Sequence, residues 1–572
     1  MFVSIHLRWN TTDRESCVSE LRTGIDENIQ ISFRQLPEPK TDTYFEVIKH
    51  WLALCDNPTK HPACRHIPLH PEAVPSRKEL PTRLIEVGAP GDPKVYLRTT
   101  KPGDTGTWMA LSHRWGPKPH FCTTPANLAS YLADGIDFAA LPPTFRDAVT
   151  VTRAVGGRCR YLWIDSLCIV QGEGGDFNDE AKRMPQVYSG AYCVLAASRA
   201  ANHYAGFLHP RKGGERAVTL RQHGGSGHPF YIRENVDDFG GHVLEGELNS
   251  RGWVLQEHAL ARRTVFFTDY QTYFECGEGV RCETMMTMRK YVPPNFPHPL
   301  QVPFPHTHSH LSDLAALLGD PNFPHIIQRA DRGEMILRYQ DLYKRYSRLG
   351  LSEDFDRPMA IDGLQRRILD ALRTKGGFGV FDQDDRKGLL HRSLLWHRDV
   401  TTADSPLRRI VFPSNWAISA VPSWSWMAYT GAIDYVSPPF NGVAWEKLRS
   451  PWSGDGVEGV KTETKVRRMA LVGEARGYNP FKGGNAAGRD DQDSGLLVFD
   501  VPGQSEQPET LCVVLGIQRH VPQDEANCYL LLVKEAAGRE DHKGQKVHER
   551  AGTGYLPGRC LDWSRSTRVI IH

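Results

Sequence analysis

The stretch YLWIDSLCIVQ, at residues 161–171, decides how the middle of this chain is expected to fold. Its apolar run is too continuous for a strand with one face in water, and it predicts a strand buried on both faces. A helix is predicted before it, because Pro143 is followed by Phe145, Ala148 and Val149 at helical spacing. A buried strand beside an amphipathic helix is the unit from which α/β domains are built.

The segments further out continue this alternation of strand and helix. Residues 108–112 and 191–197 are apolar runs typical of strands, and residues 177–188 have a helical pattern. Strand, helix, strand, helix, strand predicts a parallel sheet flanked by helices, in which ligands bind at the carboxyl ends of the strands. The pattern continues with one predicted helix and two predicted strands, at residues 254–261, 264–268 and 272–275.

The composition describes a soluble globular protein. Of its 572 residues 40% are hydrophobic and 24% are charged, and this length suggests roughly two to four domains. The net charge of +2 gives no support for a nucleic-acid partner, which calls for a basic surface. No apolar run is long enough for a membrane span, and the N-terminus lacks the pattern of a signal peptide. The twelve cysteines have no paired spacing, which fits reduced thiols and a cytoplasmic protein.

Four segments differ in pattern along the chain. We expect an N-terminal extension with one helix near residues 44–54, an α/β domain, a mainly helical region with loops, and a C-terminal region with short strands and a mobile insertion. The last two regions together predict a mixed α+β fold. The four segments are residues 1–80, 81–280, 281–450 and 451–572.

The first motif, ALSHRWG at residues 110–116, follows the first predicted strand of the α/β domain. It places the hydroxyl of Ser112, the imidazole of His113, the guanidinium of Arg114 and the indole of Trp115 where a strand ends. Arg114 suits two-pronged binding of a phosphate or carboxylate, and Trp115 suits stacking on a base or ring. The alternative is structural: Trp115 fills a gap in the core and Arg114 pairs with a local acid.

The second motif, at residues 161–171, carries polar groups inside its apolar run. Asp165 and Gln171 are costly to bury without partners, so they indicate a hydrogen-bond network or a site. We expect His113 or Arg114 as the partner of Asp165, and a purely structural pair remains the alternative. Ser166 and Cys168 complete the polar set of this motif. Cys168 is a nucleophile only if a neighbouring base lowers its pKa, and otherwise it is a small apolar filler.

Glu180 is the carboxylate of the following predicted helix that faces inward. It shares one helical face with Met184, Val187 and Tyr188, whereas Asp176 stands at the position of an N-cap. A carboxylate near the strand ends suits electrostatic stabilisation or general-base catalysis. The alternative is an exposed acid in the first turn, favoured by the helix dipole.

The third motif, SRGWVLQE at residues 250–257, opens the next predicted helix. One interpretation is that the segment docks on the sheet through Trp253 while Arg251 and Glu257 form a pair. We favour packing for Trp253 and a buried network for Arg251, Gln256 and Glu257.

A possible zinc site is suggested by four residues that lie close together in the sequence, Cys55, His61, Cys64 and His66. Their spacing does not match a known zinc finger and no second ligand pair follows, so we expect no metal site. The sequence also has no P-loop, no glycine-rich dinucleotide motif, no nucleophile elbow and no metalloprotease motif. No resident cofactor is therefore expected.

The three motifs, in this order and spacing, resemble the heterokaryon incompatibility (HET) domain of filamentous fungi. The resemblance covers residues 80–280 and is patchy elsewhere; Val170 replaces a residue that is polar in many members. It implies a role in fungal self/non-self recognition (allorecognition), in which the domain triggers programmed cell death. The family is also similar to Toll/interleukin-1 receptor (TIR) domains of innate immunity, which implies a TIR/flavodoxin-like parallel sheet flanked by helices.

The resemblance leaves the mode of action open. Some TIR domains cleave NAD with a helix-borne glutamate, and this analogy makes Glu180 the catalytic candidate of an NAD glycohydrolase (NADase), with NAD as substrate. A biosynthetic enzyme on a HET scaffold is a further alternative. No partner-sensing module accompanies the domain, so we expect a homo-oligomer or a separate incompatibility partner protein.

Overall fold

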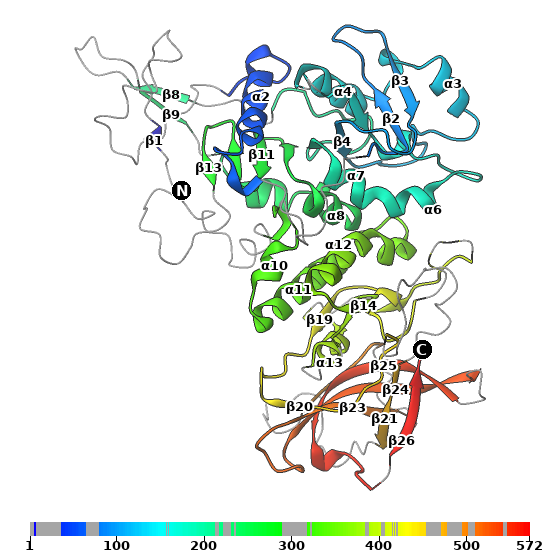
Figure 1. The fold of residues 1–572 in the computed structure, drawn as a ribbon. Coiled ribbons are helices and arrows are strands. Elements are labelled where there is room, and N and C mark those ends of the chain that lie inside the picture. Colours follow the sequence, from blue (N-terminus) through cyan, green and yellow to red (C-terminus); the bar gives the residue numbers. More distant parts are fainter. Residues whose placement is uncertain are drawn as a thin grey trace. The chain divides into compact units, whose positions relative to one another are not determined.

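The structure is a computed structural model, and the chain in it divides into two compact units, Met1–Ile326 and Ile327–His572 (Figure 1). Residues 291–310 are rich in proline and lack a periodic pattern, which predicts a loop, and residues 450–495 are rich in Gly, Asp and Lys, which predicts the insertion. The first segment and most of the second lie outside the described residues. None of the helices in the described part has the length and apolar character that a membrane crossing requires. The structure describes residues 5–6, 36–64, 79–155, 157, 159–211, 217–220, 230–233, 236–288, 317–320, 323–383, 388–401, 407–414, 416, 418, 421–452, 471–477, 495–501, 510–540, 546–564 and 566–572.

A ten-stranded mixed sheet forms the centre of the first unit. Its strand order is β13-β12-β11-β10-β7-β4-β6-β2-β3-β5. The four central strands β10, β7, β4 and β6 run parallel, and their neighbours on both sides run antiparallel to them. The strands are β2 (Arg83–Glu86), β3 (Lys94–Thr99), β4 (Trp108–Ser112), β5 (Ile136–Asp137), β6 (Tyr161–Trp163), β7 (Cys193–Ala196), β10 (Thr264–Phe267), β11 (Thr272–Cys276), β12 (Gly279–Cys282) and β13 (Thr287–Met288).

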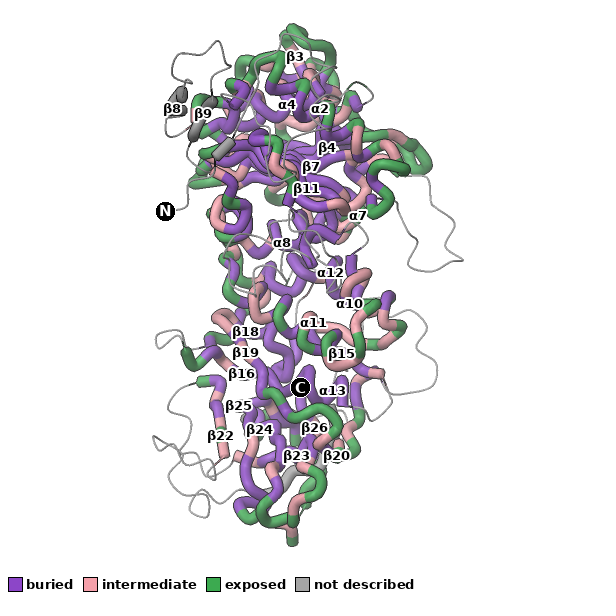
Figure 2. Tube along the Cα trace, turned by 90° about the vertical axis from the view of Figure 1, so that its left-hand side faces the viewer, coloured by how far each residue is buried: buried purple, intermediate pink, exposed green. Residues whose placement is uncertain are grey.

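Helices cover both faces of this sheet. In Figure 1, α2 and α4 lie on one face, and α7 and α8 lie together on the other. Every residue of β4, β7 and β10 is buried, as expected for strands covered on both sides, and Figure 2 shows β4 and β7 inside the unit. The helices are α2 (Asp42–Asp56), α3 (Leu128–Ala133), α4 (Pro143–Val155), α5 (Asp165–Cys168), α6 (Phe177–Glu180), α7 (Met184–Gly190) and α8 (Gly252–Leu260), with shorter turns at Pro62–Cys64, Phe138–Ala140, Ala181–Arg183, Gly240–Leu244 and Leu248–Ser250.

The chain reverses its direction across the sheet beside β4. Among the four parallel strands, β4 comes first in the sequence, β6 lies on one side of it, and β7 and then β10 lie on the other. In open α/β sheets the crevice at such a reversal, at the carboxyl ends of the strands, is where ligands bind. The first motif leaves β4 at that edge, and the second leaves β6 there.

The α/β fold and its parallel core are confirmed, but two predicted elements are wrong in detail. The strand predicted over residues 161–170 ends at Trp163, because Asp165 starts the short helix α5. The helix predicted over residues 177–188 is broken by a 3-10 turn at Ala181–Arg183, just before Pro185. The sheet is also mixed rather than wholly parallel. A separate sheet pairs β1 (Ile5–His6), β9 (Phe230–Arg233) and β8 (Ala217–Leu220).

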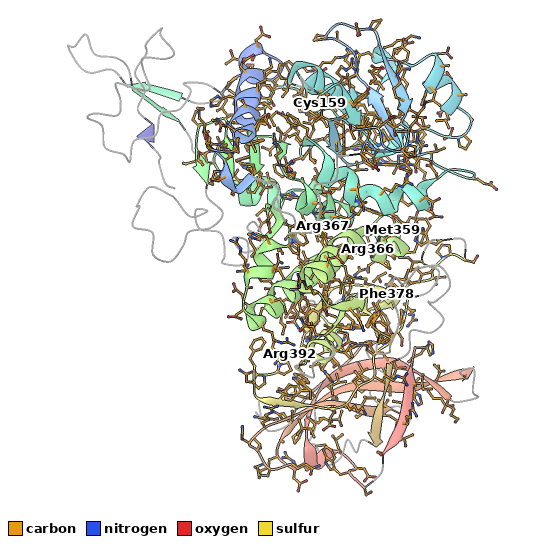
Figure 3. All side chains as sticks on the ribbon, viewed as in Figure 1. Cys159, Met359, Arg366, Arg367, Phe378 and Arg392 are labelled. Atoms are coloured by element: carbon orange, nitrogen blue, oxygen red, sulfur yellow. The ribbon has the colours of Figure 1, made fainter. Side chains whose placement is uncertain are left out.

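The second unit joins helices to a barrel-like sheet. Strands β23, β21, β26, β25 and β24 pair in a closed ring, and β20 and β22 pair with further residues of β23 and β25. Arg392 of α13, labelled in Figure 3, donates to the carbonyls of Pro438 and Pro439. This is the α+β arrangement expected for the C-terminal half.

The helices at the start of this unit are α10 (His325–Arg329), α11 (Arg332–Ser347), α12 (Arg357–Leu372) and α13 (Leu389–Leu394). The strands are β14 (Lys375–Gly377), β15 (Val380–Asp382), β16 (Trp396–Arg398), β17 (Arg408–Arg409), β18 (Tyr429–Thr430), β19 (Ile433–Tyr435), β20 (Val443–Trp445), β21 (Leu471–Gly477), β22 (Leu496–Phe499), β23 (Leu511–Gln518), β24 (Asn527–Glu540), β25 (Lys546–Pro557) and β26 (Thr567–Ile571), with 3-10 turns at Asp354–Asp356, Trp426–Ala428 and Gly558–Cys560.

Candidate functional site

The three motifs meet at the carboxyl ends of the parallel strands. Ser112 is the last residue of β4, and a single residue separates Asp165 from the end of β6. The third motif reaches the same edge on α8, which connects the neighbouring parallel strands β7 and β10. Cys159, labelled in Figure 3, precedes β6 and marks the opposite edge, where the parallel strands begin.

The first and third motifs are joined by a hydrogen bond between two buried side chains. Ser112 Oγ donates to Glu257 Oε2 at 2.5 Å, and the two residues are 3% and 5% exposed. Burial raises the pKa of Glu257 to about 7; the bonds from Ser112 and Tyr188 and the charge of Arg251 oppose this rise. Glu257 thus exchanges a proton near neutral pH, which is the range that general acid–base catalysis needs.

The first and second motifs are joined through Asp165. Trp115 Nε1 donates to Asp165 Oδ2 at 2.7 Å, and His113 Nδ1 lies 3.8 Å from Asp165 Oδ1. The backbone N–H of Ser166 also donates to this carboxylate, at 2.7 Å. Burial nevertheless raises the pKa of Asp165. His113, expected as a partner of Asp165, does lie beside it, whereas the side chain that donates a hydrogen bond is that of Trp115.

Arg251 carries the positive charge that acts on the whole cluster. Its Nη1 donates to the carbonyl of His113 at 3.4 Å, and its charge lowers the pKa values of both Asp165 and Glu257. The interpretation that pairs Arg251 directly with Glu257 is therefore corrected, because Glu257 bonds to Ser112 and Arg251 reaches backbone.

An aromatic cluster of three histidines lies beside this network. The ring of His203 lies 5.0 Å from that of His113 and 5.8 Å from that of His120. The Trp115 ring lies 5.7 Å from His203 and 5.1 Å from His120. Phe145 packs against His113 and His203. Burial lowers the pKa of His113 and of His203 to about 3, so both rings are neutral at physiological pH. Within the described part of the chain, neither ring nitrogen of His113 or His203 has a hydrogen-bond partner.

Several predicted site residues serve the local structure. Arg114 donates to the carbonyl of Ala200 and pairs with Glu247, and it does not contact Asp165 as expected. Gln171 donates to the carbonyl of its neighbour Ile169. Trp253 is half-buried and meets Phe177 edge to face, while Gln256 is fully buried.

Cys168 is a packed thiol in the second motif. It is 1% exposed, and the backbone N–H of Ile164 donates to its sulfur at 3.5 Å. Burial raises the pKa of the Cys168 thiol to about 12, so the thiolate that a nucleophile requires is not formed near neutral pH. The apolar-filler interpretation therefore fits this environment. Ser166, its neighbour, is also fully buried.

Glu180 lies at the same edge of the sheet but is bound elsewhere. Its Oε1 accepts hydrogen bonds from Thr82 Oγ1 at 2.8 Å and from Arg183 Nη1 at 3.2 Å. Thr82 precedes β2, which is separated from β4 by β6. Glu180 is buried, as its helical face predicted, yet no contact joins it to Ser112 or Glu257 among those of the described residues.

The helix that carries Glu180 is held by Arg83. Arg83 Nε donates to the carbonyl of Cys168 at 2.7 Å, and its guanidinium pairs with Asp176. Asp176 also accepts from the backbone N–H of Val170, at 2.9 Å. Asp176 stands at the N-cap position of α6, as predicted, but its carboxylate makes no capping bond to this helix.

Sequence reasoning missed the histidines that complete the cluster. His120 and His203 lie outside all three motifs, in irregular segments that carry no periodic pattern. The Lys118–Pro119–His120 stretch turns back beside Trp115, and His203 follows β7, where a residue at the carboxyl end of a parallel strand was a fair candidate. A position after a predicted strand is the sequence feature that His203 shares with the motif residues.

A surface hollow of about 690 Å³ lies away from this cluster. Its lining comes from α2, the segment before β3 and the end of α4, including Lys49, Asp92 and Arg153. The end of α4 leads into the start of β6, so the hollow lies toward the edge of the sheet opposite to the motifs. None of the predicted site residues lines this hollow.

One comparison with known proteins gives a match. The family model described as heterokaryon incompatibility protein (HET) matches residues 108–257. These limits run from the first residue of β4 to Glu257, so the match contains all three motifs and Glu180. No curated protein and no solved structure matches the chain.

Proposed function

We propose that the protein is an effector of heterokaryon incompatibility that promotes programmed cell death, because residues 108–257 match the family model of the HET domain. The observation that carries the proposal is the convergence of the three motifs of the domain on one edge of the sheet. Ser112, Asp165 and Glu257 come from three separate elements and are tied together by the bonds of Ser112 and Trp115. A buried network of this kind is costly to form unless it is fully satisfied.

Two features support an active role for this network rather than a purely structural one. It contains two carboxyl groups with raised pKa values next to a half-buried arginine, which is a combination common at functional sites. It also lies at the reversal point beside β4, where open α/β sheets bind their ligands. The strand order, with the second strand beside the first and the third on the other side, is that of flavodoxin-like sheets and supports the proposed likeness to TIR domains.

Inducible expression in a filamentous fungus tests the proposal. The wild-type chain should arrest growth and kill cells, and Arg251→Ala should restore growth, because it removes the charge shared by Asp165 and Glu257. Arg98→Ala is the matched control, since Arg98 lies on β3 and pairs with Glu86 away from the cluster. If cells expressing the wild type grow normally, or if Arg251→Ala kills as efficiently at equal protein level, the proposal is wrong.

We further propose NAD hydrolysis as the reaction behind this activity, with Glu257 favoured over Glu180. The specific observation is a buried carboxyl group whose pKa is about 7, bonded to Ser112. The carboxylate of Glu180 is instead occupied by Thr82 and Arg183. Trp115, half-buried in the same cluster, supplies an aromatic face on which a nicotinamide or adenine ring can stack.

The reaction is balanced by one water molecule. The bond between nicotinamide and C1′ of the ribose breaks, and nicotinamide leaves with the bonding electrons. A water oxygen forms the new bond to C1′ and gives its proton to the ionised Glu257, from which it passes to solvent. The products are ADP-ribose, nicotinamide and a proton. A carboxylate also stabilises the positive charge that develops on the ribose ring in such a transition state.

Release of nicotinamide from NAD by the purified protein measures this reaction. We expect Glu257→Gln to lower the rate by about 10²-fold or more, the usual worth of an acid–base group. Glu180→Gln should change it far less, since Glu180 acts on Thr82 and Arg183. Equal loss in both variants, or loss in Glu180→Gln alone, would return the assignment to Glu180. An inactive wild type with intact killing would exclude NAD hydrolysis and leave the effector proposal standing.

A further inference from the structure

Three cysteines and one histidine converge in the first unit, away from the HET motifs. The side chains of Cys55, His61, Cys64 and Cys276 are all buried, and their ligand atoms (three sulfurs and one ring nitrogen) all lie within 4.8 Å of one another. The sulfurs of Cys64 and Cys276 lie 3.8 and 3.6 Å from His61 Nδ1. All three cysteines are free thiols.

The ligand atoms are brought together from three local structures. Cys55 lies in the last turn of α2, and His61 and Cys64 lie on the turn that follows it. Cys276 is the last residue of β11, 215 residues after His61. In Figure 1, α2 lies beside β11, and stacking of Trp51 on Phe274 holds the helix against this part of the sheet.

The separations fit a tetrahedral metal ion. Zinc bonds to sulfur and imidazole nitrogen are about 2.3 and 2.0–2.1 Å long, so ligand atoms at tetrahedral angles stand roughly 3.5–3.8 Å apart. Both measured distances from His61 Nδ1 agree with this spacing. The two residues between His61 and Cys64 also match the short spacing of zinc ligand pairs. Three thiolates and an imidazole are ligands that select zinc over magnesium or calcium.

The charges around the cluster suit a metal with three thiolate ligands. Such a site has a net charge of −1 with Zn²⁺, and two arginines lie against it. Arg262 Nη2 donates to the carbonyl of Cys64 at 3.0 Å, and Arg281 Nη2 lies 3.2 Å from His61 Nε2. Arg281 therefore leaves Nδ1 as the nitrogen that faces the sulfurs. With a metal ion on Nδ1 the proton stays on Nε2, so we expect the guanidinium to turn toward the thiolates.

We propose that Cys55, His61, Cys64 and Cys276 bind a structural zinc ion that fastens α2 and the following turn to the hairpin of β11 and β12. A closed set of four protein ligands leaves no position for water or substrate, which is the mark of a structural site rather than a catalytic one. The contact between the two turns is already organised by a bond from the backbone N–H of Ala63 to Glu278, at 2.8 Å. The fourth ligand, Cys276, lies on a strand distant in the sequence from the other three. His66, which lies near them in the sequence, is outside the described residues.

Metal content of the full-length protein tests the site directly. The protein purified under reducing conditions with zinc present should hold about one zinc ion per chain by mass spectrometry. Replacement of zinc by Co²⁺ should give the visible absorption of tetrahedral cobalt with thiolate ligands. Cys276→Ser should lose the metal, whereas the matched control Cys193→Ser, a buried cysteine of β7, should keep it.

Three results on the wild-type protein would overturn the proposal, and none of these three depends on a folded variant. The first is wild-type protein without metal after purification in zinc. The second is a Co²⁺ spectrum without thiolate ligation. The third is a count of fewer than twelve thiols in denatured, unreduced wild-type protein that lacks metal, which would show that two of these cysteines form a disulfide bond instead. A fourth result uses the variant. If Cys276→Ser retains as much metal as the wild type, the ion is bound elsewhere.

Discussion

Ser112 at the end of β4 donates its hydroxyl proton to Glu257 on α8, 145 residues further along the chain. This bond joins the end of the first strand of the HET match to the last matched residue, and both groups are buried. A carboxyl group in such a position favours its neutral form, because charge is costly away from water. Stability and activity near this bond should therefore depend on pH.

Glu257→Gln should change how stability varies with pH. The pKa of Glu257 is 4.5 in the unfolded chain and about 7 in the folded one, so folding takes up a proton between these pH values. The free energy of unfolding of the wild type therefore falls as the pH rises through this range. Glutamine cannot ionise, so the variant should lose up to about 1.4 kcal/mol per pH unit of this slope. Urea titrations from pH 4.5 to 7 measure it; parallel curves for both proteins would contradict the shift.

His203→Phe should have the opposite effect, at acid pH. The pKa of His203 falls from 6.5 in the unfolded chain to about 3 in the folded one, mainly through burial. The unfolded state binds the extra proton between these values, so the wild type loses stability as the pH falls. Phenylalanine keeps the ring packing without that proton, and the slope should flatten by about 1.4 kcal/mol per pH unit. Acid unfolding followed by fluorescence tests this; His209→Phe, at an exposed position, is the control.

Cys168→Ala should leave killing and NAD turnover unchanged. The sulfur of Cys168 is buried and protonated, and it fills space in the core as part of the second motif. Loss of one sulfur from a packed site should lower the free energy of unfolding by about 1–2 kcal/mol. Growth assays at matched protein level measure the first expectation and urea titration the second. A stable but inactive Cys168→Ala would restore the nucleophile hypothesis.

Arg550→Met should destabilise the second unit strongly. Arg550 Nε lies 3.0 Å from Asp500 Oδ2, and both side chains are almost fully buried. Removing the arginine leaves a buried carboxylate without its cation, which costs about 3–5 kcal/mol. The Arg550→Met, Asp500→Leu double variant should recover most of this loss, and Arg568→Met, at an exposed position on β26, should cost little. Denaturant unfolding compares the three; failure of the double variant to recover would assign the effect to packing.

The alternating pattern of the sequence predicted the centre of the sheet correctly, for a physical reason. Strands covered on both faces must be apolar throughout, and this rule located β4 and β7 within two residues of their ends. It overextended β6, because residues 164–170 are equally buried in the helix α5 and the turn after it. Burial alone does not distinguish a buried strand from a buried helix.

The members of the site were predictable only where they lay in motifs. Ser112, Asp165 and Glu257 lie in recognisable sequence motifs, at or near the ends of strands or on a helix. In the structure Ser112 bonds to Glu257, and Asp165 accepts from Trp115 at the same edge of the sheet. The partners within the site depend on side-chain directions, which no sequence pattern records. That is why Trp115, rather than Arg114, reaches Asp165, and why Cys276 was not associated with Cys64.

The position of β2 has a consequence for how small this domain can be made. The family match starts at residue 108, yet Thr82 and Arg83 at the start of β2 hold Glu180 and Asp176 inside it. A fragment of residues 108–257 would keep β4, β6 and β7 of the sheet, together with the short β5, which would lose its partner β3. It would expose the edges of β6 and β7, which are apolar and aggregation-prone. The segment that folds on its own is therefore longer than the family match. Truncated proteins should begin before residue 81 and end after β13.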